Sequence, residues 1–206
     1  MSISGLFLIL FLLIHVTVNS LSLISPEAFE AGCEFMALPV ITVIVPILAL
    51  GFIIHIIYAT VLTLGNLKAR GNTRYAVPHK GASDSFAAKN MFVLGIIVLG
   101  VLAFHLTHFW ADMQLQEWMG NEPEDPNGLL AQTFSSPWIT VIYIIWFAAL
   151  WFHLTHGFWS AFQTIGFNNM IWIKRLKVIA YIVATIIFLG FTATALAACF
   201  RANCIL

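Results

Sequence analysis

The chain has 206 residues and no formal net charge, with 61% hydrophobic and only 9% charged residues. Soluble domains usually carry about 25% charged residues, and a chain of this size cannot bury so much apolar surface in one globule surrounded by water. The composition therefore predicts a membrane protein. The absence of excess positive charge gives no indication of a nucleic-acid partner.

Five apolar stretches follow one another along the chain, and none contains Asp, Glu, Lys or Arg. A helix needs roughly 20 apolar residues to cross the hydrocarbon core of a bilayer. Backbone polar groups in lipid must be paired within the protein, which favours helices over open strands. The predicted fold is therefore all-α, a single five-helix transmembrane bundle over residues 1–206, with spans at about 4–24, 37–64, 91–110, 138–163 and 178–200.

Charged residues are segregated between alternate connections. Eight of the nine basic residues follow the second or the fourth span: Lys68, Arg70, Arg74, Lys80, Lys89, Lys174, Arg175 and Lys177. Eight of the nine acidic residues follow the first or the third span: Glu27, Glu30, Glu34, Asp112, Glu117, Glu122, Glu124 and Asp125. Because basic loops remain in the cytoplasm, we expect a cytoplasmic N-terminus and a C-terminus outside.

Histidines mark the interior of the predicted bundle. Six of the seven lie in or at the ends of spans: His15, His55, His105, His108, His153 and His156. With the expected orientation, His15, His105 and His108 fall in the outer half of the membrane, and His55, His153 and His156 in the inner half. Intramembrane ionisable residues are functional candidates by default.

Two histidine clusters at two depths, each drawn from two helices, are typical of a pair of b-type haems. Each iron needs one imidazole on each face, and facing helices of a bundle can supply them. The sequence FHLTH occurs in both the third and the fourth spans, so its two histidines share one helix face. Spacing alone does not choose between His105 and His108, or between His153 and His156.

Six sequence pieces, taken in order, cover nearly the whole chain. They are GLFLILFLLIH, IIHIIYA, NLKARGNTRYA, HFWADM, SSPW and FHLTHGFWSAFQT. With these pieces the chain resembles the cytochrome b subunit of type B succinate:quinone oxidoreductases, the succinate dehydrogenases and quinol:fumarate reductases. The resemblance implies two haem b groups. Its axial ligands fall on His15 and His108 for the outer haem, and on His55 and His153 for the inner haem. His105 and His156 remain secondary candidates for the haem pockets.

The resemblance also implies partners. These are an iron–sulfur subunit, a flavoprotein subunit that interconverts succinate and fumarate, and a membrane quinone, expected to be menaquinone. Glu34 is the candidate carboxylate for the quinone site, and the basic connections are the candidate docking surface for the iron–sulfur subunit. The expected location is the cytoplasmic membrane of a bacterium, and a dimer of complexes is compatible with the resemblance.

Neither partner chemistry is expected on this chain, which lacks a dinucleotide-binding glycine fingerprint and a cysteine set for an iron–sulfur cluster. Three alternatives remain open at this point. One is the cytochrome b anchor of another respiratory complex, such as a hydrogenase or a formate dehydrogenase. The others are a membrane di-iron oxygenase, whose histidines would gather at one membrane face, and a non-haem anchor or transporter with a polar path.

Overall fold

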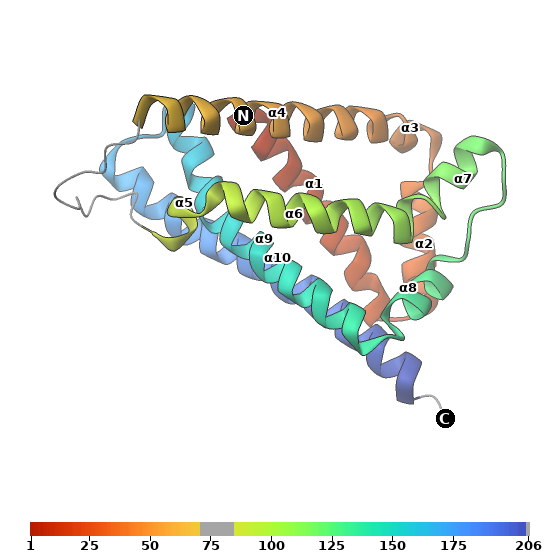
Figure 1. Cartoon of the computed structure of the whole chain (residues 1–206). Helices are drawn as coiled ribbons and strands as arrows, with labels where there is room; N and C mark the ends of the chain where they lie inside the picture. Colours follow the sequence, from red (N-terminus) through yellow and green to blue (C-terminus); the bar gives the residue numbers. More distant parts are fainter. Residues whose placement is uncertain (71–84, 205–206) are drawn as a thin grey trace.

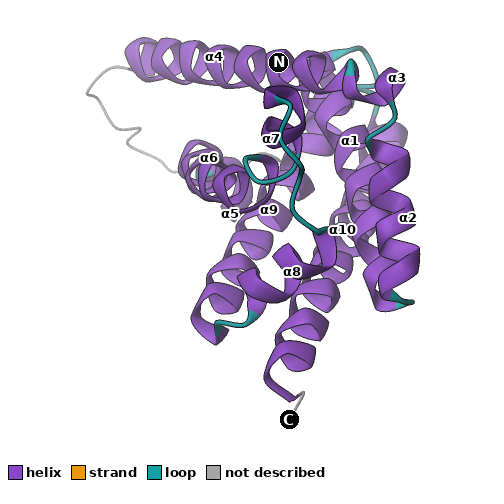
Figure 2. Cartoon of the chain, turned by 90° about the vertical axis from the view of Figure 1, so that its right-hand side faces the viewer, coloured by secondary structure: helices purple, strands orange, loops and turns teal. Residues whose placement is uncertain are grey.

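In the computed structural model, residues 1–70 and 85–204 are described. All regular structure in these ranges is helical (Figure 2). Five helical segments are long and apolar enough to cross a membrane: Ser2–Leu23, Pro39–Ala69, Met91–Trp110, Pro137–Thr164 and Met170–Cys204. The prediction of an all-α fold with five helices able to span a membrane is confirmed for the described residues.

The centre of the bundle is the contact between helix α9 (Pro137–Thr164) and helix α10 (Met170–Cys204). Small residues on α10 allow the two helices to approach closely, as is usual between membrane helices. Ala180 and Ala184 are fully buried, and Tyr143 and Ile187 are each only 1% exposed. Helix α1 (Ser2–Ser20) packs on both α9 and α10, and α6 (Met91–His105) packs on α9 (Figure 1).

The second span is broken near its start. A short helix, α3 (Pro39–Thr42), is separated by Val43 from α4 (Ile44–Arg70). Pro46 has no N–H to donate to the carbonyl of Thr42, so the helical hydrogen-bond ladder cannot run through this position. Helix α4 contacts α1 and α6 at the edge of the bundle, and no residue of Ile44–Ala69 is buried.

Short helices close one end of the bundle. They are α2 (Pro26–Met36), α7 (Gln114–Met119) and α8 (Pro126–Phe134). Ser25 and Asp125 begin α2 and α8 by accepting backbone N–H groups of the first turn, and each is followed by a proline at the first helical position. The side-chain cap pairs a backbone N–H group that a helix start leaves unpaired, and the proline removes another such N–H group.

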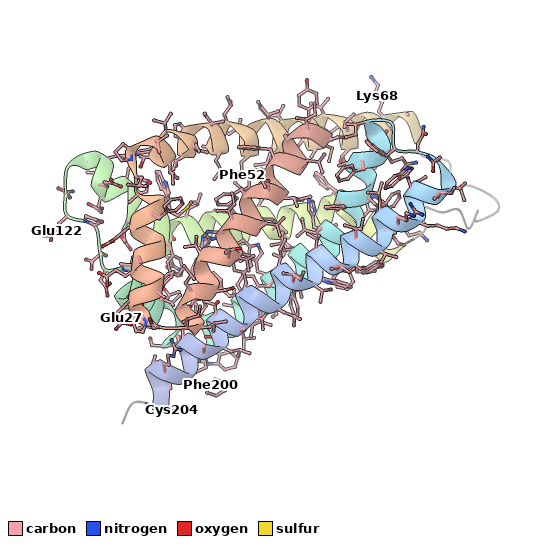
Figure 3. All side chains as sticks on the ribbon, turned by 180° about the vertical axis from the view of Figure 1, so that it is seen from behind. Glu27, Phe52, Lys68, Glu122, Phe200 and Cys204 are labelled. Atoms are coloured by element: carbon pink, nitrogen blue, oxygen red, sulfur yellow. The ribbon has the colours of Figure 1, made fainter. Side chains whose placement is uncertain are left out.

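The other end holds the described lysines and arginines except Arg201, which donates a hydrogen bond to the carbonyl of Ser22 near the end of α1. Helix α5 (Phe86–Lys89), the end of α9 and the start of α10 lie there (Figure 1). Helix α10 begins at Met170, and its first turns include Lys174, Arg175 and Lys177. The loop between α9 and α10 is therefore shorter than the loop that the sequence predicts between the fourth and fifth spans. Figure 3 shows Lys68 at this end of the molecule and Glu27 and Glu122 at the opposite end. Arg74, His79 and Lys80 lie outside the described residues.

Candidate functional site

The first histidine pair consists of His15 on α1 and His105 at the end of α6. It is called the outer pair, and the pair of His55 and His153 the inner pair, after the membrane halves in which the sequence predicts them. Their ring centroids are 5.9 Å apart and the rings are nearly perpendicular, at 78°. The ring of Phe11, one helical turn earlier, stacks on His15 at 5.2 Å. The side-chain amide of Asn19, one turn later, lies 3.4 Å from Nδ1 of His15. The His15 ring is therefore held by neighbours on its own helix and by Phe191 of α10, 5.5 Å away, with one ring nitrogen beside a polar side chain.

His108 faces a different neighbour. It lies in a π-helical turn, Leu106–Trp110, that follows α6, and its Nδ1 is 3.3 Å from the hydroxyl of Tyr143. The two rings are stacked at 6.4 Å, and Phe104 covers His108 edge-on at 4.0 Å. The resemblance assigned the outer pair to His15 and His108, but in the structure the ring beside His15 is that of His105. Both rings contact Tyr143 of α9, but in the described residues it is His105 that also reaches His15 of α1.

The inner pair consists of His55 on α4 and His153 on α9. Their ring centroids are 6.4 Å apart, at an interplanar angle of 68°. The hydroxyl of Ser4 lies 3.3 Å from Nδ1 of His55. Glycines from two other helices face these rings. A Cβ on Gly5 would lie 3.4 Å from Cε1 of His55, and one on Gly95 would lie 3.8 Å from Cε1 of His153.

One cavity joins the two pairs. It has a volume of about 1340 Å³ and is lined by His15, His55, His105, His153 and His156, together with mostly apolar side chains of α1, α4, α6 and α9. His108 is not among the lining residues. Small-molecule pockets usually measure about 300–1,000 Å³, so this cavity is larger than one ordinary ligand requires.

The two pairs fit a metal held between imidazoles. Bonds from a metal to an imidazole nitrogen are roughly 2 Å long, so a metal between two rings places their centroids about 6 Å apart. Both observed separations agree with this value. Within the described residues, the buried Nδ1 atoms of His105 and His153 have no hydrogen-bond partner. A buried polar atom without a partner costs free energy, which favours a bound group that uses the ring.

Two candidates remain from the sequence, Glu34 for a quinone site and His156 for a haem pocket. Glu34 is exposed on α2 and does not line the cavity. Among the described residues, the carboxylate that lines it is Glu117 of α7, which accepts a hydrogen bond of 2.7 Å from the amide of Gln114. His156 lines the inner end of the cavity, and its buried Nδ1 has no partner among the described residues.

Cys33 of α2 also lines the cavity, outside the membrane-spanning segments. Burial raises the pKa of its thiol to about 11, with smaller contributions from the negative charges of Asp125 and Glu30. The thiol is therefore neutral at physiological pH, which does not favour it as a metal ligand or nucleophile.

Several contacts of the site could not be anticipated. Spacing in the sequence does not reveal that Ser4 reaches His55 or that Tyr143 takes up His108, because each contact joins two spans. Asn19 is different, since it lies four residues after His15 and so on the same helix face.

Comparison of the chain with family models, with curated proteins and with solved structures finds no match.

Proposed function

We propose that this chain is the dihaem cytochrome b anchor of a succinate:quinone oxidoreductase, and that it passes electrons between a membrane quinone and the iron–sulfur subunit. The observation that supports the proposal most is the pair of imidazole contacts at two places along one apolar cavity. The ordered sequence pieces that resemble this family are the second support.

The proposed ligands of the outer haem are His15 and His105, and those of the inner haem are His55 and His153. This choice keeps three of the four ligands that the resemblance implies and replaces His108 by His105. A haem iron between two imidazoles supplies one-electron transfer.

The chain's own residues orient the rings. Polar side chains lie beside Nδ1 of His15 and of His55, so the other ring nitrogen is available to a metal. Such second partners fix the tautomer and the orientation of a ligating histidine. The lining of the cavity is mostly apolar, and the polarity of the surroundings influences the redox potential of a bound haem.

A menaquinone is the proposed exchangeable partner at the outer end of the cavity. Because Glu117 lines the cavity there and Glu34 does not, Glu117 replaces Glu34 as the proposed carboxylate of the quinone site. Its exposed carboxylate and the amide of Gln114 are hydrogen-bonding groups of the kind that a quinone oxygen requires.

The proposed docking surface for the iron–sulfur subunit is the basic end of the bundle, formed in the described residues by Lys68, Lys89, Lys174 and Arg175. The flavoprotein subunit then binds through the iron–sulfur subunit. The proposed location is a bacterial cytoplasmic membrane, with the basic end and the N-terminus inside.

The test is to purify the tagged full chain from its native membranes under mild conditions. We expect an iron–sulfur protein and a flavoprotein to co-purify, and succinate to reduce the b-type haem absorbance of the preparation. A variant with His153→Ala should keep the partners but lose the inner haem signal. If haem is present but succinate does not reduce it and neither partner co-purifies, the chain belongs to another respiratory complex.

A further inference from the structure

A second, smaller cavity lies at the basic end of the bundle, between α5, α9 and α10. It has a volume of about 180 Å³, and its polar lining comes from Ser85, Thr155, His156, Lys177 and Tyr181. Its aromatic lining comes from Phe86, Trp151, Phe152 and Trp159. We propose that this cavity binds the phosphate headgroup of an anionic phospholipid. The inference is independent of the proposed electron-transfer function.

Lys177 supplies the positive charge of the cavity. Its ammonium group lies over the ring of Trp159, 4.6 Å from the centroid, and Lys177 forms no ion pair with any residue of 1–70 or 85–204. A cation over an aromatic face is held in place without being neutralised. With respect to the described residues, Lys177 can therefore accept an anion without first giving up an acidic partner.

The depth of Lys177 matches that of a lipid phosphate. Helix α10 has 35 residues, whereas about 20 cross the hydrocarbon core, so its first turns lie at the level of the headgroups. Lys177 and Ser85 lie toward that end of the cavity. Trp151 lies earlier in α9 and Tyr181 later in α10, so both lie nearer the middle of the bundle.

The opening of the cavity is apolar. Phe86 is 62% exposed and Tyr181 is 51% exposed, and a surface of this kind suits acyl chains running beside the helices. Aromatic side chains are enriched at this level of membrane proteins, and basic pockets between membrane helices on the cytoplasmic side are known to bind phosphate headgroups of lipids. The hydroxyl of Thr155 donates to the carbonyl of Phe152, which leaves the hydroxyls of Ser85 and Tyr181 as donors to a ligand. The combination of one fixed ammonium, these two hydroxyls and an apolar mouth favours a lipid over a free phosphate ion.

The test uses native mass spectrometry of the purified full chain after exchange into mixed detergent micelles that contain phosphatidylglycerol and phosphatidylcholine. We expect the wild-type chain to retain phosphatidylglycerol preferentially. Lys177→Gln should lower the retained fraction about fivefold, which corresponds to roughly 1 kcal/mol for one basic residue at the membrane surface. Lys174→Gln, an exposed residue one turn earlier that does not line the cavity, is the matched control and should retain as much lipid as the wild type.

Three outcomes would overturn the proposal. They are equal retention by Lys177→Gln and Lys174→Gln, equal retention of the two lipids by the wild type, and displacement of the lipid by excess inorganic phosphate, which would make the cavity a free-phosphate site. If Lys177→Gln does not fold, Lys177→Met keeps the aliphatic stem against Trp159 and serves in its place, with the same expected loss.

Discussion

At the scale of single residues, the site depends on which histidine of the third span faces His15. The two candidates are three residues apart, and residues at this spacing lie on nearly the same face of a helix. The π-helical turn that begins at Leu106 follows His105 directly and includes His108. Turns of this kind are rare and occur frequently at functional sites, and no pattern in the sequence predicts this one. The resemblance chose His108, whereas the contact with His15 and the lining of the cavity favour His105.

Substitution of the two histidines distinguishes these assignments. We expect His105→Ala to lower the haem content of the purified chain from two groups to one, because one imidazole of the outer pair is removed. His108→Ala removes only a ring that contacts Tyr143 and Phe104, and should leave both haems bound. Haem per chain is measured by the pyridine haemochrome spectrum. The opposite result, with loss in His108→Ala alone, would restore the ligand set that the resemblance implies.

The thiol of Cys33 provides a prediction on pH. Because its pKa is raised to about 11, the reactive thiolate is scarce until the pH approaches that value. We expect the rate of alkylation of Cys33 by iodoacetamide to stay low between pH 7 and pH 9 in the folded chain and to be much higher after unfolding in denaturing detergent. The rates are followed by peptide mass spectrometry. Equal rates in the folded and unfolded chains would show that Cys33 is not shielded.

At the scale of the helices, the existence of the five spans could be predicted because length and apolarity alone decide whether a segment can cross a bilayer. Their bounds could be predicted less well. Helix α10 begins at Met170 rather than near 178, because a helix can continue beyond the apolar core through Lys174 and Arg175. Beyond the span pairs that share histidines, the contacts between helices could not be predicted, since in lipid a contact depends on small residues rather than on hydrophobicity.

Gly190 is one of these small residues. A Cβ at this position of α10 would collide with Cγ2 of Val16 on α1, and Val16 is buried and stiff about its first side-chain torsion. We expect Gly190→Ala to destabilise the chain by about 1–3 kcal/mol through overpacking, measured as a lower midpoint of thermal unfolding in detergent.

Gly100 of α6 is the matched control for Gly190. A Cβ there would meet none of the described residues within 4 Å. Since alanine favours a helix over glycine by up to about 1 kcal/mol, Gly100→Ala should leave the midpoint unchanged or raise it. A midpoint for Gly190→Ala that equals that of Gly100→Ala would contradict the proposed close contact of α1 with α10.

At the scale of the whole molecule, the charges separate along the bundle as the sequence indicates. Glu27 and Glu122 lie at one end and Lys68 lies at the other (Figure 3). The two histidine pairs lie at different places between these ends, each formed by two helices that are not adjacent in the chain. The placement of the histidines at two depths could be predicted from the charges of the connections and the order of the spans. The contacts within each level required the three-dimensional arrangement of the helices.

The orientation in the membrane can be tested with two exposed residues at the opposite ends. In a chain with its natural cysteines replaced by serine, we expect Glu122→Cys to react with a membrane-impermeant maleimide in intact cells, because the proposed orientation puts the acidic end outside. Lys68→Cys should react only after the membrane is permeabilised, because basic segments remain inside. The reverse pattern would place the N-terminus outside and exchange the inner and outer histidine pairs.

The central claim is that His15 with His105, and His55 with His153, each hold one haem in the interior of the bundle. The most direct test is the number of b-type haems per chain, obtained from the reduced-minus-oxidised spectrum and the pyridine haemochrome of the chain purified from membranes. The account predicts two low-spin b-type haems per chain. A chain that is folded and contains no haem, or only one, would contradict it.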